Sequence, residues 1–252
     1  MYNEVVNRTS KLESIRELAE EQWGLVTRRQ IENAQIPRTT IERLTTSGAL
    51  LERVAHGVYR FAGSPIPDHL ELRAAWLQLA PEIPAWQRSH EKGVVSHRSA
   101  AALYEIGHLP ADLHEFTLQR RKQTRRRDVR LHKRPLDDNQ WIQLRGLPAT
   151  RPARIASDLL YSNEDPGAVA QIIADAIRRV FDYPGAIATS LSPHAKRFGL
   201  RSGDGLSLLH WLLEIVGGNE TDQWMTEARN AVVHENFQRT PIPSLLEARP
   251  PS

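Results

Sequence analysis

Apolar residues in the first part of the chain recur at helical spacing between clear stop signals. A capping-box pattern, S-x-x-E, occupies residues 10–13, and apolar positions such as Leu12 and Ile15 follow at intervals of three. Gly24 stands where the C-terminal glycine of a helix is expected. These features predict a first helix over roughly residues 10–22.

Two short helices joined by a tight turn follow. Residues 27–30, Thr-Arg-Arg-Gln, form a second capping-box pattern and predict a helix over about residues 28–34. Pro37 suits the first turn of a third helix, which we expect to continue to Thr46 and to close at Gly48. Two such helices, the second ending at a glycine, are the pattern of a helix-turn-helix.

A hairpin pattern comes next. Residues 50–54 and 58–61 have the composition of strands, and Gly57 between them supplies the positive φ of a tight turn. A fourth helix is expected over about residues 68–79. Because three helices followed by a hairpin are the order of a winged helix, residues 1–80 are predicted to form a winged helix-turn-helix domain.

The rest of the chain, residues 81–252, mixes strand and helix patterns. The prolines and polar residues of 81–92 indicate a linker or boundary loop. The expected strands are 114–118, 129–132 and 141–144, and the expected helices run from Ser96 to near Gly107 and over about 150–160, 165–181, 185–198 and 205–216. The tail from Gln238 onward is expected to be irregular. The predicted fold class is therefore α+β, with an N-terminal winged helix-turn-helix and a larger α+β domain whose C-terminal half is helical.

Composition excludes several classes of protein. The 252 residues contain no cysteine, which rules out disulfides, thiolate nucleophiles and cysteine-ligated metal sites. The mean hydropathy is -0.48 and no apolar run is long enough to span a membrane. The N-terminal residues lack the apolar core of a secretory signal, so we expect a soluble protein of the cytoplasm that makes no membrane contact.

The charge is distributed unevenly. Residues 1–80 hold ten basic and ten acidic side chains, whereas Arg120–Arg134 holds nine Lys or Arg against the single Asp128. A basic run this local favours a polyanionic partner over a merely solvated loop. Lying between two expected strands, it is predicted to form a hairpin tip or an extended arm.

The predicted third helix has a face suited to DNA. Ile41 and Leu44 define its buried side, which leaves polar residues pointing outward, as in a recognition helix that enters the major groove. The candidate DNA-binding residues, including phosphate contacts from the second helix and the wing, are Arg28, Arg29, Arg38, Thr39, Thr40, Arg43, Thr46, Arg53, His56 and Arg60. The candidate accessory phosphate-binding residues are Arg120, Arg121, Lys122, Arg125, Arg126 and Arg127. The expected partner is double-stranded DNA.

No catalytic motif is found. The ten histidines form neither H-x-x-x-H nor H-E-x-x-H and are interpreted as surface or capping residues, and neither a G-x-S-x-G elbow nor a P-loop is present. Asp158 and Glu164 could form a metal-binding pair of carboxylates, but the E-x-K element of restriction-type nucleases is absent. We therefore predict no enzyme, no metal and no cofactor. A nuclease-like second domain would be indicated by metal-dependent cleavage.

Three segments carry a resemblance to a known family. Residues 24–30, the third helix and residues 56–60, His-Gly-Val-Tyr-Arg, resemble the N-terminal winged helix of AbiEi-type antitoxins. Residues 94–101, Val-Val-Ser-His-Arg-Ser-Ala-Ala, resemble the start of that family's second domain. Residues 146–159 are similar to its G-L-P-x-T-x-P-x-R-T-x-x-D motif, with Ile155 where the family often has Thr.

The resemblance implies a type IV bacterial antitoxin. Such proteins repress their own operon through the winged helix, usually at inverted repeats, and their second domain opposes a nucleotidyltransferase toxin. The leading hypothesis is therefore a sequence-specific DNA-binding repressor that acts as an antitoxin. The alternative is a protein- or RNA-interaction module that acts through the basic hairpin 120–134, with the winged helix as scaffold; the neutral charge of residues 1–80 favours this alternative.

Overall fold

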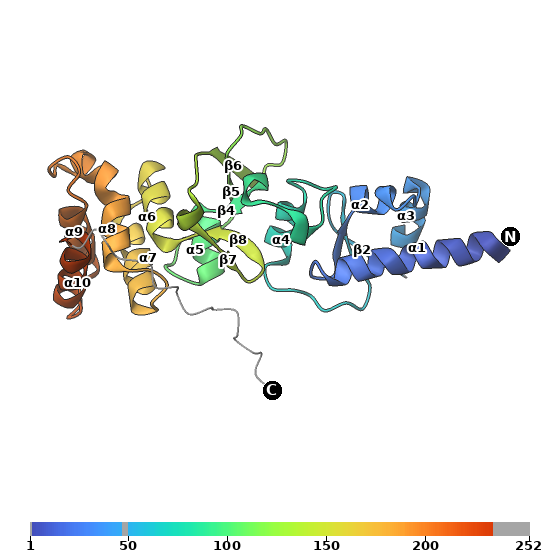
Figure 1. Ribbon diagram of the computed structural model, residues 1–252, viewed down its shortest axis with the longest axis horizontal. Helices are drawn as coiled ribbons and strands as arrows, with labels where there is room; N and C mark the ends of the chain where they lie inside the picture. The colour runs from blue at the N-terminus through green and yellow to red at the C-terminus, as the bar shows by residue number, and fades with distance from the viewer. Residues whose placement is uncertain (1, 47–49, 234–252) are drawn as a thin grey trace. The chain divides into compact units, whose positions relative to one another are not determined.

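The computed structural model describes residues 2–46 and 50–233 and divides into two compact units, Met1–Gly93 and Val94–Ser252 (Figure 1). Both combine helices with a sheet, so the α+β class is confirmed. The predicted close of the third helix at Gly48 and the predicted irregular tail lie outside the described residues. In the part of the chain that is described, no helix is both long and apolar enough to cross a membrane.

The first unit packs four helices around a three-stranded antiparallel sheet of order β1-β3-β2. Its elements are α1 (Tyr2–Glu20), β1 (Leu25–Thr27), α2 (Arg28–Asn33), α3 (Arg38–Thr46), β2 (Leu51–Ala55), β3 (Val58–Phe61) and α4 (Leu70–Leu77). Every element from α1 to β3 contributes apolar side chains to one core. Its buried members are Ile15, Ala19, Val26, Ile31, Ile36, Ile41, Leu51 and Phe61. This order is the one predicted from the periodicity.

The first helix differs from its prediction at one end. It begins at Tyr2, so Ser10 lies inside the helix, where its carbonyl accepts a hydrogen bond from the Ser14 hydroxyl at 3.1 Å. The expected cap at Ser10 is therefore wrong, because helical backbone continues on its N-terminal side. At the other end Gly24 has φ +75° and donates its N–H to the Ala19 carbonyl at 2.7 Å, as expected of a glycine that ends a helix.

The capping box at the start of α2 is confirmed. The Gln30 N–H donates to the Thr27 hydroxyl at 3.1 Å, and the Gln30 side chain accepts the Thr27 N–H at 2.9 Å. Two amide groups that α2 itself cannot satisfy are thus paired locally.

Residues 81–93 belong to the first unit rather than forming a linker. Two short 3-10 turns, η1 (Ala85–Gln87) and η2 (His90–Lys92), lie in this segment. The Arg88 guanidinium donates to the carbonyls of Trp76, Leu77 and Ala80, which holds the segment at the C-terminal end of α4. The first unit therefore extends through Gly93 instead of ending at residue 80.

The second unit contains a five-stranded mixed sheet of order β6-β5-β4-β8-β7. The elements up to the last strand are β4 (Val94–Val95), α5 (His97–Tyr104), β5 (His114–Leu118), β6 (Val129–Lys133), η3 (Asp138–Gln140), β7 (Trp141–Leu144) and β8 (Leu147–Thr150). Helices fill the C-terminal half: α6 (Pro152–Tyr161), α7 (Pro166–Arg178), α8 (Pro184–Leu191), η4 (Ser192–Phe198), α9 (Gly205–Val216) and α10 (Thr221–Val233). Figure 1 shows α6 to α10 stacked beside one another within this unit.

The basic segment is not a hairpin. β5 and β6 pair in parallel, with His114 opposite Val129 and Leu118 opposite Lys133. The connection therefore runs back along the strands from the end of β5 to the start of β6, and residues 119–128 form a crossover loop without a helix. The hairpin prediction is wrong because two strands with the same apolar pattern can pair in either direction.

Among the strands and α-helices of the second unit, β4, β8 and α10 have no counterpart among the predicted elements. β8 is fully buried between β4 and β7, although it contains Pro148, and α10 follows the last predicted helix.

At the crossing of α8 and α9, a Cβ on Gly205 would lie 1.9 Å from the Ala188 carbonyl oxygen, so only glycine permits this close approach.

Candidate functional site

The start of α2 is bound directly to the turn between β2 and β3, the two strands (residues 51–61) that are called the wing from here on. The Arg28 N–H donates to the Gly57 carbonyl at 2.8 Å, and Gly57 adopts φ +70° between β2 and β3. α3 is anchored separately by Ile41, which is buried in the core, and by the partly buried Leu44. The two helices and the wing are therefore held as one frame from which side chains project.

The outward face of α3 carries the predicted base-contacting residues. Arg38, Thr39, Arg43 and Thr46 are exposed, and Thr40 is half-buried. Arg38 donates to the Glu42 carboxylate at 2.9 Å, one turn along the helix. Arg43 forms no ion pair with any residue in the described ranges, so its guanidinium is open to a partner.

The arginines of α2 share one carboxylate. Arg28 and Arg29 lie 3.3 Å and 3.5 Å from the two oxygens of Glu32. Arg29 is the more exposed of the two. Their charges are thus partly neutralised within the helix, and a phosphate would have to compete with Glu32 for them.

The wing residues differ from one another in their availability. An Arg53 guanidinium N–H lies 3.1 Å from the Nδ1 atom of His56, and both side chains are exposed. Arg60 instead bonds to the Glu52 carboxylate and to the Ser64 carbonyl, and only 11% of its side chain is exposed. Arg60 therefore holds the strands of the wing together and does not face solvent as the sequence had suggested.

A buried amide pair fixes α2 against its neighbours. The side chains of Gln22 and Gln30 donate to each other at 2.7 Å and 3.2 Å, and Gln22 also donates to the Leu25 carbonyl. The Ala85 N–H donates to the Gln22 side chain at 3.2 Å. The sequence pattern predicted the capping role of Gln30 but not the buried position of Gln22, because no local pattern indicates that this side chain is buried.

In the second unit, the loop 119–128 holds the predicted accessory cations on the surface. Arg120, Arg121, Lys122, Arg125 and Arg127 are exposed. Arg126 differs, because it pairs with Asp128. The hydrogen bond from Arg126 holds the pKa of the Asp128 carboxyl below its usual range. The loop thus contains one internally neutralised arginine among exposed cations.

Part of this loop lines an open cavity of about 430 Å³ at the edge of the sheet. Its lining combines the start of the loop with the C-terminal ends of β5 and β6: Leu118, Arg120, Arg121, Lys122, Gln123, Leu131, His132 and Lys133. No acidic residue is in this lining, whereas two leucines and a histidine are.

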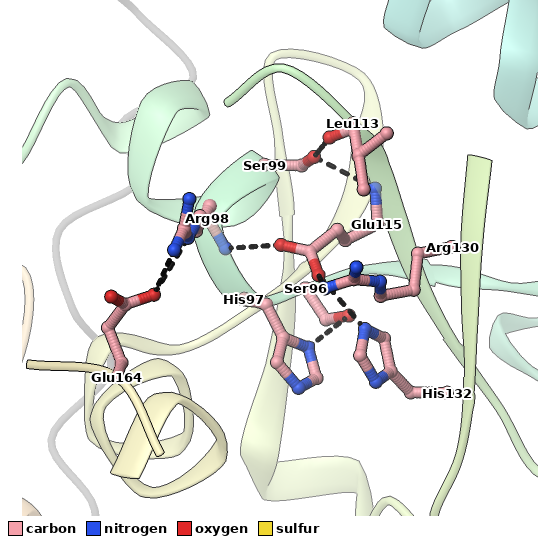
Figure 2. A network of polar contacts seen from close by, with 9 residues as sticks. All are labelled: Ser96, His97, Arg98, Ser99, Leu113, Glu115, Arg130, His132 and Glu164. Atoms are coloured by element: carbon pink, nitrogen blue, oxygen red, sulfur yellow. Dashed lines mark hydrogen bonds and ion pairs between the residues drawn. The ribbon is translucent and has the colours of Figure 1, made fainter. Parts of the chain in front are cut away.

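His132, which lines the cavity, also belongs to a polar network with residues of β4, α5 and β5 (Figure 2). Its Nε2 atom lies 3.1 Å from the Glu115 carboxylate, and its ring stacks on the His97 ring with centroids 3.6 Å apart. The second Glu115 oxygen accepts the Arg98 N–H at 3.1 Å, and the His97 Nδ1 atom lies 3.0 Å from the Ser96 hydroxyl.

Burial governs the protonation of this network. The pKa of His97 falls from 6.5 to about 4, first because the ring is desolvated and second because His132 lies against it. Burial alone would raise the pKa of Glu115, but the hydrogen bond from His132 and the other neighbours hold it below its usual value. His97 is therefore neutral and Glu115 ionised at neutral pH.

The carboxylates considered as a metal pair are instead bound by arginines. Asp158 is fully buried and accepts from Arg134 at 2.8 Å and from Arg154 at 2.9 Å. Glu164 accepts from Arg98 at 2.8 Å. No group of three or more histidine, aspartate or glutamate side chains within the described ranges is placed to hold a metal ion.

The sequence missed the importance of His97, Glu115 and Asp158. His97, interpreted there as a surface or capping residue, is only 2% exposed and has φ +53°, which is uncommon for a side chain of this size. The nearby apolar pair Val94 and Val95, separated from His97 by Ser96, was the only local indication of burial.

Comparison with known proteins bears on the first unit alone. Residues 13–62 match the family model described as "Transcriptional regulator, AbiEi antitoxin". No curated protein matches the chain. The matched segment runs from α1 to the end of the wing and includes α2 and α3. The N-terminal region of this chain is thus similar, over residues 13–62, to the AbiEi antitoxin family of transcriptional regulators.

Proposed function

We propose that this chain is a sequence-specific DNA-binding repressor and the autoregulating antitoxin of a type IV toxin–antitoxin system. The observation that carries the proposal is the match of residues 13–62 to a family of transcriptional regulators, over the segment that presents the exposed face of α3. Acting on DNA, the protein works in the bacterial cytoplasm, and we assign it no catalytic role.

α3 is the element that reads bases. Arg38 and Arg43 can each form two hydrogen bonds to a guanine edge, and Thr39 and Thr46 can contact a thymine methyl group or a phosphate. Thr40, which is half-buried, lies at the margin of this face. Arg38 must exchange its bond to Glu42 for one to DNA, so Arg43 contributes more to affinity.

Phosphates are held by α2 and the wing. Arg28 and Arg29 lie at the N-terminus of α2, Arg53 lies in β2, and His56 lies in the turn that follows β2. Contacts of this kind set the position of the protein on the duplex without reading sequence. Arg60 acts indirectly, by positioning the wing through its bond to Glu52.

The test is a titration of the full chain against DNA from its own upstream region and against scrambled DNA, at two salt concentrations. Preference for the upstream DNA at both salts supports base reading, because phosphate contacts alone weaken steeply with salt. Equal, salt-sensitive binding to both DNAs overturns it. An inverted repeat in the protected region would fit a dimeric complex.

Variants separate base contacts from phosphate contacts. We expect Arg38→Ala and Arg43→Ala each to cost about 1–3 kcal/mol of binding and to relax sequence preference. Arg125→Ala, in the loop 119–128, is the control and should cost less, equally on both DNAs. Equal changes of preference in all three variants would contradict the role of α3.

The second candidate is an interaction module that acts through the basic segment 120–134. The exposed cations of the loop favour it, as does the pairing of several first-unit arginines with carboxylates. Its partner would be an acidic protein or an RNA, and a co-encoded nucleotidyltransferase toxin is the first protein to test. Retained toxin neutralisation by a DNA-binding-deficient variant such as Arg43→Ala would show that the two activities are separable.

A further inference from the structure

The cavity in the second unit has features of a ligand site that DNA binding does not explain. We propose that it binds the polyphosphate group of a small nucleotide, with the loop 119–128 closing over the phosphates. This inference does not depend on α3 or on DNA recognition, because every residue that carries it lies in the second unit.

The first argument is location. The cavity lies at the C-terminal ends of the parallel strands β5 and β6, where Leu118 and Lys133 stand opposite each other. In sheets with parallel strands, ligands commonly bind beyond these ends, where connecting loops can surround them. Here the loop that follows β5 supplies four of the lining residues.

The second argument is charge. Four lining residues are Lys or Arg, a fifth is His132, and none is acidic. Arg120, Arg121 and Lys133 form no ion pair with any described residue. Repulsion among cations gathered around one cavity is relieved by a ligand with several negative charges in a small volume, and a polyphosphate has this property.

The third argument is size and rigidity. About 430 Å³ falls within the range of small-molecule sites but is far too small for a duplex, which could touch only the rim. His132 is held by Glu115 and stacked on His97, so one wall of the cavity is fixed before a ligand arrives (Figure 2). Leu118 and Leu131 add apolar surface suited to a nucleoside.

The remainder of the loop supplies a matched control. Arg125 and Arg127 are exposed cations of the same loop but do not line the cavity. Arg120→Gln/Arg121→Gln and Arg125→Gln/Arg127→Gln therefore remove the same charge from the same loop, and only the first pair removes it from the cavity. All four side chains are exposed, so both double variants should fold.

The experiment is calorimetric titration of the full chain with sodium tripolyphosphate, ATP, adenosine and a short single-stranded DNA oligonucleotide. We expect tripolyphosphate and ATP to bind and adenosine not to. Arg120→Gln/Arg121→Gln should weaken ATP binding at least tenfold, which corresponds to about 1.4 kcal/mol, whereas the control pair should change it less than threefold. Arg38→Ala/Arg43→Ala should bind ATP as the wild type does.

Three outcomes would overturn the proposal. One is no heat of binding with either polyphosphate. Another is an equal loss in the two loop variants, which would show a diffuse effect of charge rather than a site. The third is binding of the oligonucleotide without ATP, which would assign the loop to nucleic acid. These outcomes do not depend on DNA binding, so the proposal can be tested even if α3 does not recognise DNA.

Discussion

The two units bury different kinds of polar group. Around α2 the first unit encloses neutral side chains, Gln22, Thr27 and Gln30, which satisfy one another and nearby backbone groups, and its buried ion, Arg73, lies on α4 and does not titrate near neutral pH. The second unit encloses ionisable ones, including His97, Glu115 and Asp158. Burying an amide that is fully hydrogen-bonded is nearly neutral in free energy, whereas burying a charge requires a matched partner.

This difference predicts that the stability of the two units depends differently on pH. A frame built on amides keeps its geometry across the pH range in which the protein works, which suits a surface that must present α3 in one orientation. A network of histidine and carboxylate side chains depends on protonation. We therefore expect acid to affect the second unit before the first.

The largest effect is expected from the buried carboxylate. Asp158→Ala leaves Arg134 and Arg154 without their shared partner. We expect the free energy of unfolding of the second unit, measured by urea denaturation, to fall by about 3–5 kcal/mol. Asp128→Ala removes an exposed partner of Arg126 and should cost at most about 1 kcal/mol. Similar losses in the two variants would remove the distinction between buried and exposed pairs.

The next effect is a dependence on pH. Above pH 6.5, His97 is neutral whether the chain is folded or not. As pH falls towards 4, the unfolded chain gains a proton that the folded one resists, so stability declines by roughly 3 kcal/mol over this window.

His97→Asn tests that dependence. Asparagine tolerates the φ of +53° found at this position and does not titrate. The free energy of unfolding of the variant, measured from pH 7 to pH 4, should decline less than that of the wild type. Parallel curves for the two proteins would show that His97 does not carry the effect.

A smaller effect is expected in the first unit. Gln30→Ala removes half of the capping box and leaves Gln22 short of a partner, which should cost about 1–2 kcal/mol. The loss should be the same at pH 5 and pH 8, because no ionisable group is involved. Asn33→Ala, exposed on the same helix, should change stability by less than about 0.5 kcal/mol.

The smallest change in stability is expected on α3. Glu42→Gln breaks an exposed ion pair with Arg38 and should alter the free energy of unfolding by no more than about 0.5 kcal/mol. It should nevertheless raise affinity for the upstream DNA about twofold to threefold, since Arg38 is released. Glu71→Gln, which makes the same charge change on α4, serves as the control. An equal rise in both would point to net charge alone.

Local patterns predicted the first unit well because its elements are set by local chemistry. The capping box at Thr27, Gly24 after the C-terminal end of α1 and Gly57 in the wing can each be recognised from a few neighbouring residues. The part of the candidate site that lies on α3 follows from the same periodicity. What a sequence pattern could not show is that Glu52 holds Arg60, because that contact joins two strands.

The second unit was harder to predict because its structure depends on distant pairings. Parallel and antiparallel strands share one apolar pattern, so the direction of β6 was open. Pro148 argues against a central strand, yet β8 lies in the interior of the sheet, between β4 and β7. The register of β8 with β4 pairs only Val95 with Ala149. The burial of His97 likewise results from stacking on a residue far along the chain.

The connection between β5 and β6 is short for a crossover between parallel strands, which usually takes a dozen or more residues. Its ends are separated by four strand positions along the sheet and one strand spacing across it, about 14 Å in total. An extended chain covers that distance with four or five residues, and residues 119–128 provide ten. The other five or six residues carry the chain over the face of the sheet instead of through the paired strands, so we expect deletion of Arg125 and Arg127 to strain the crossover and loosen β6.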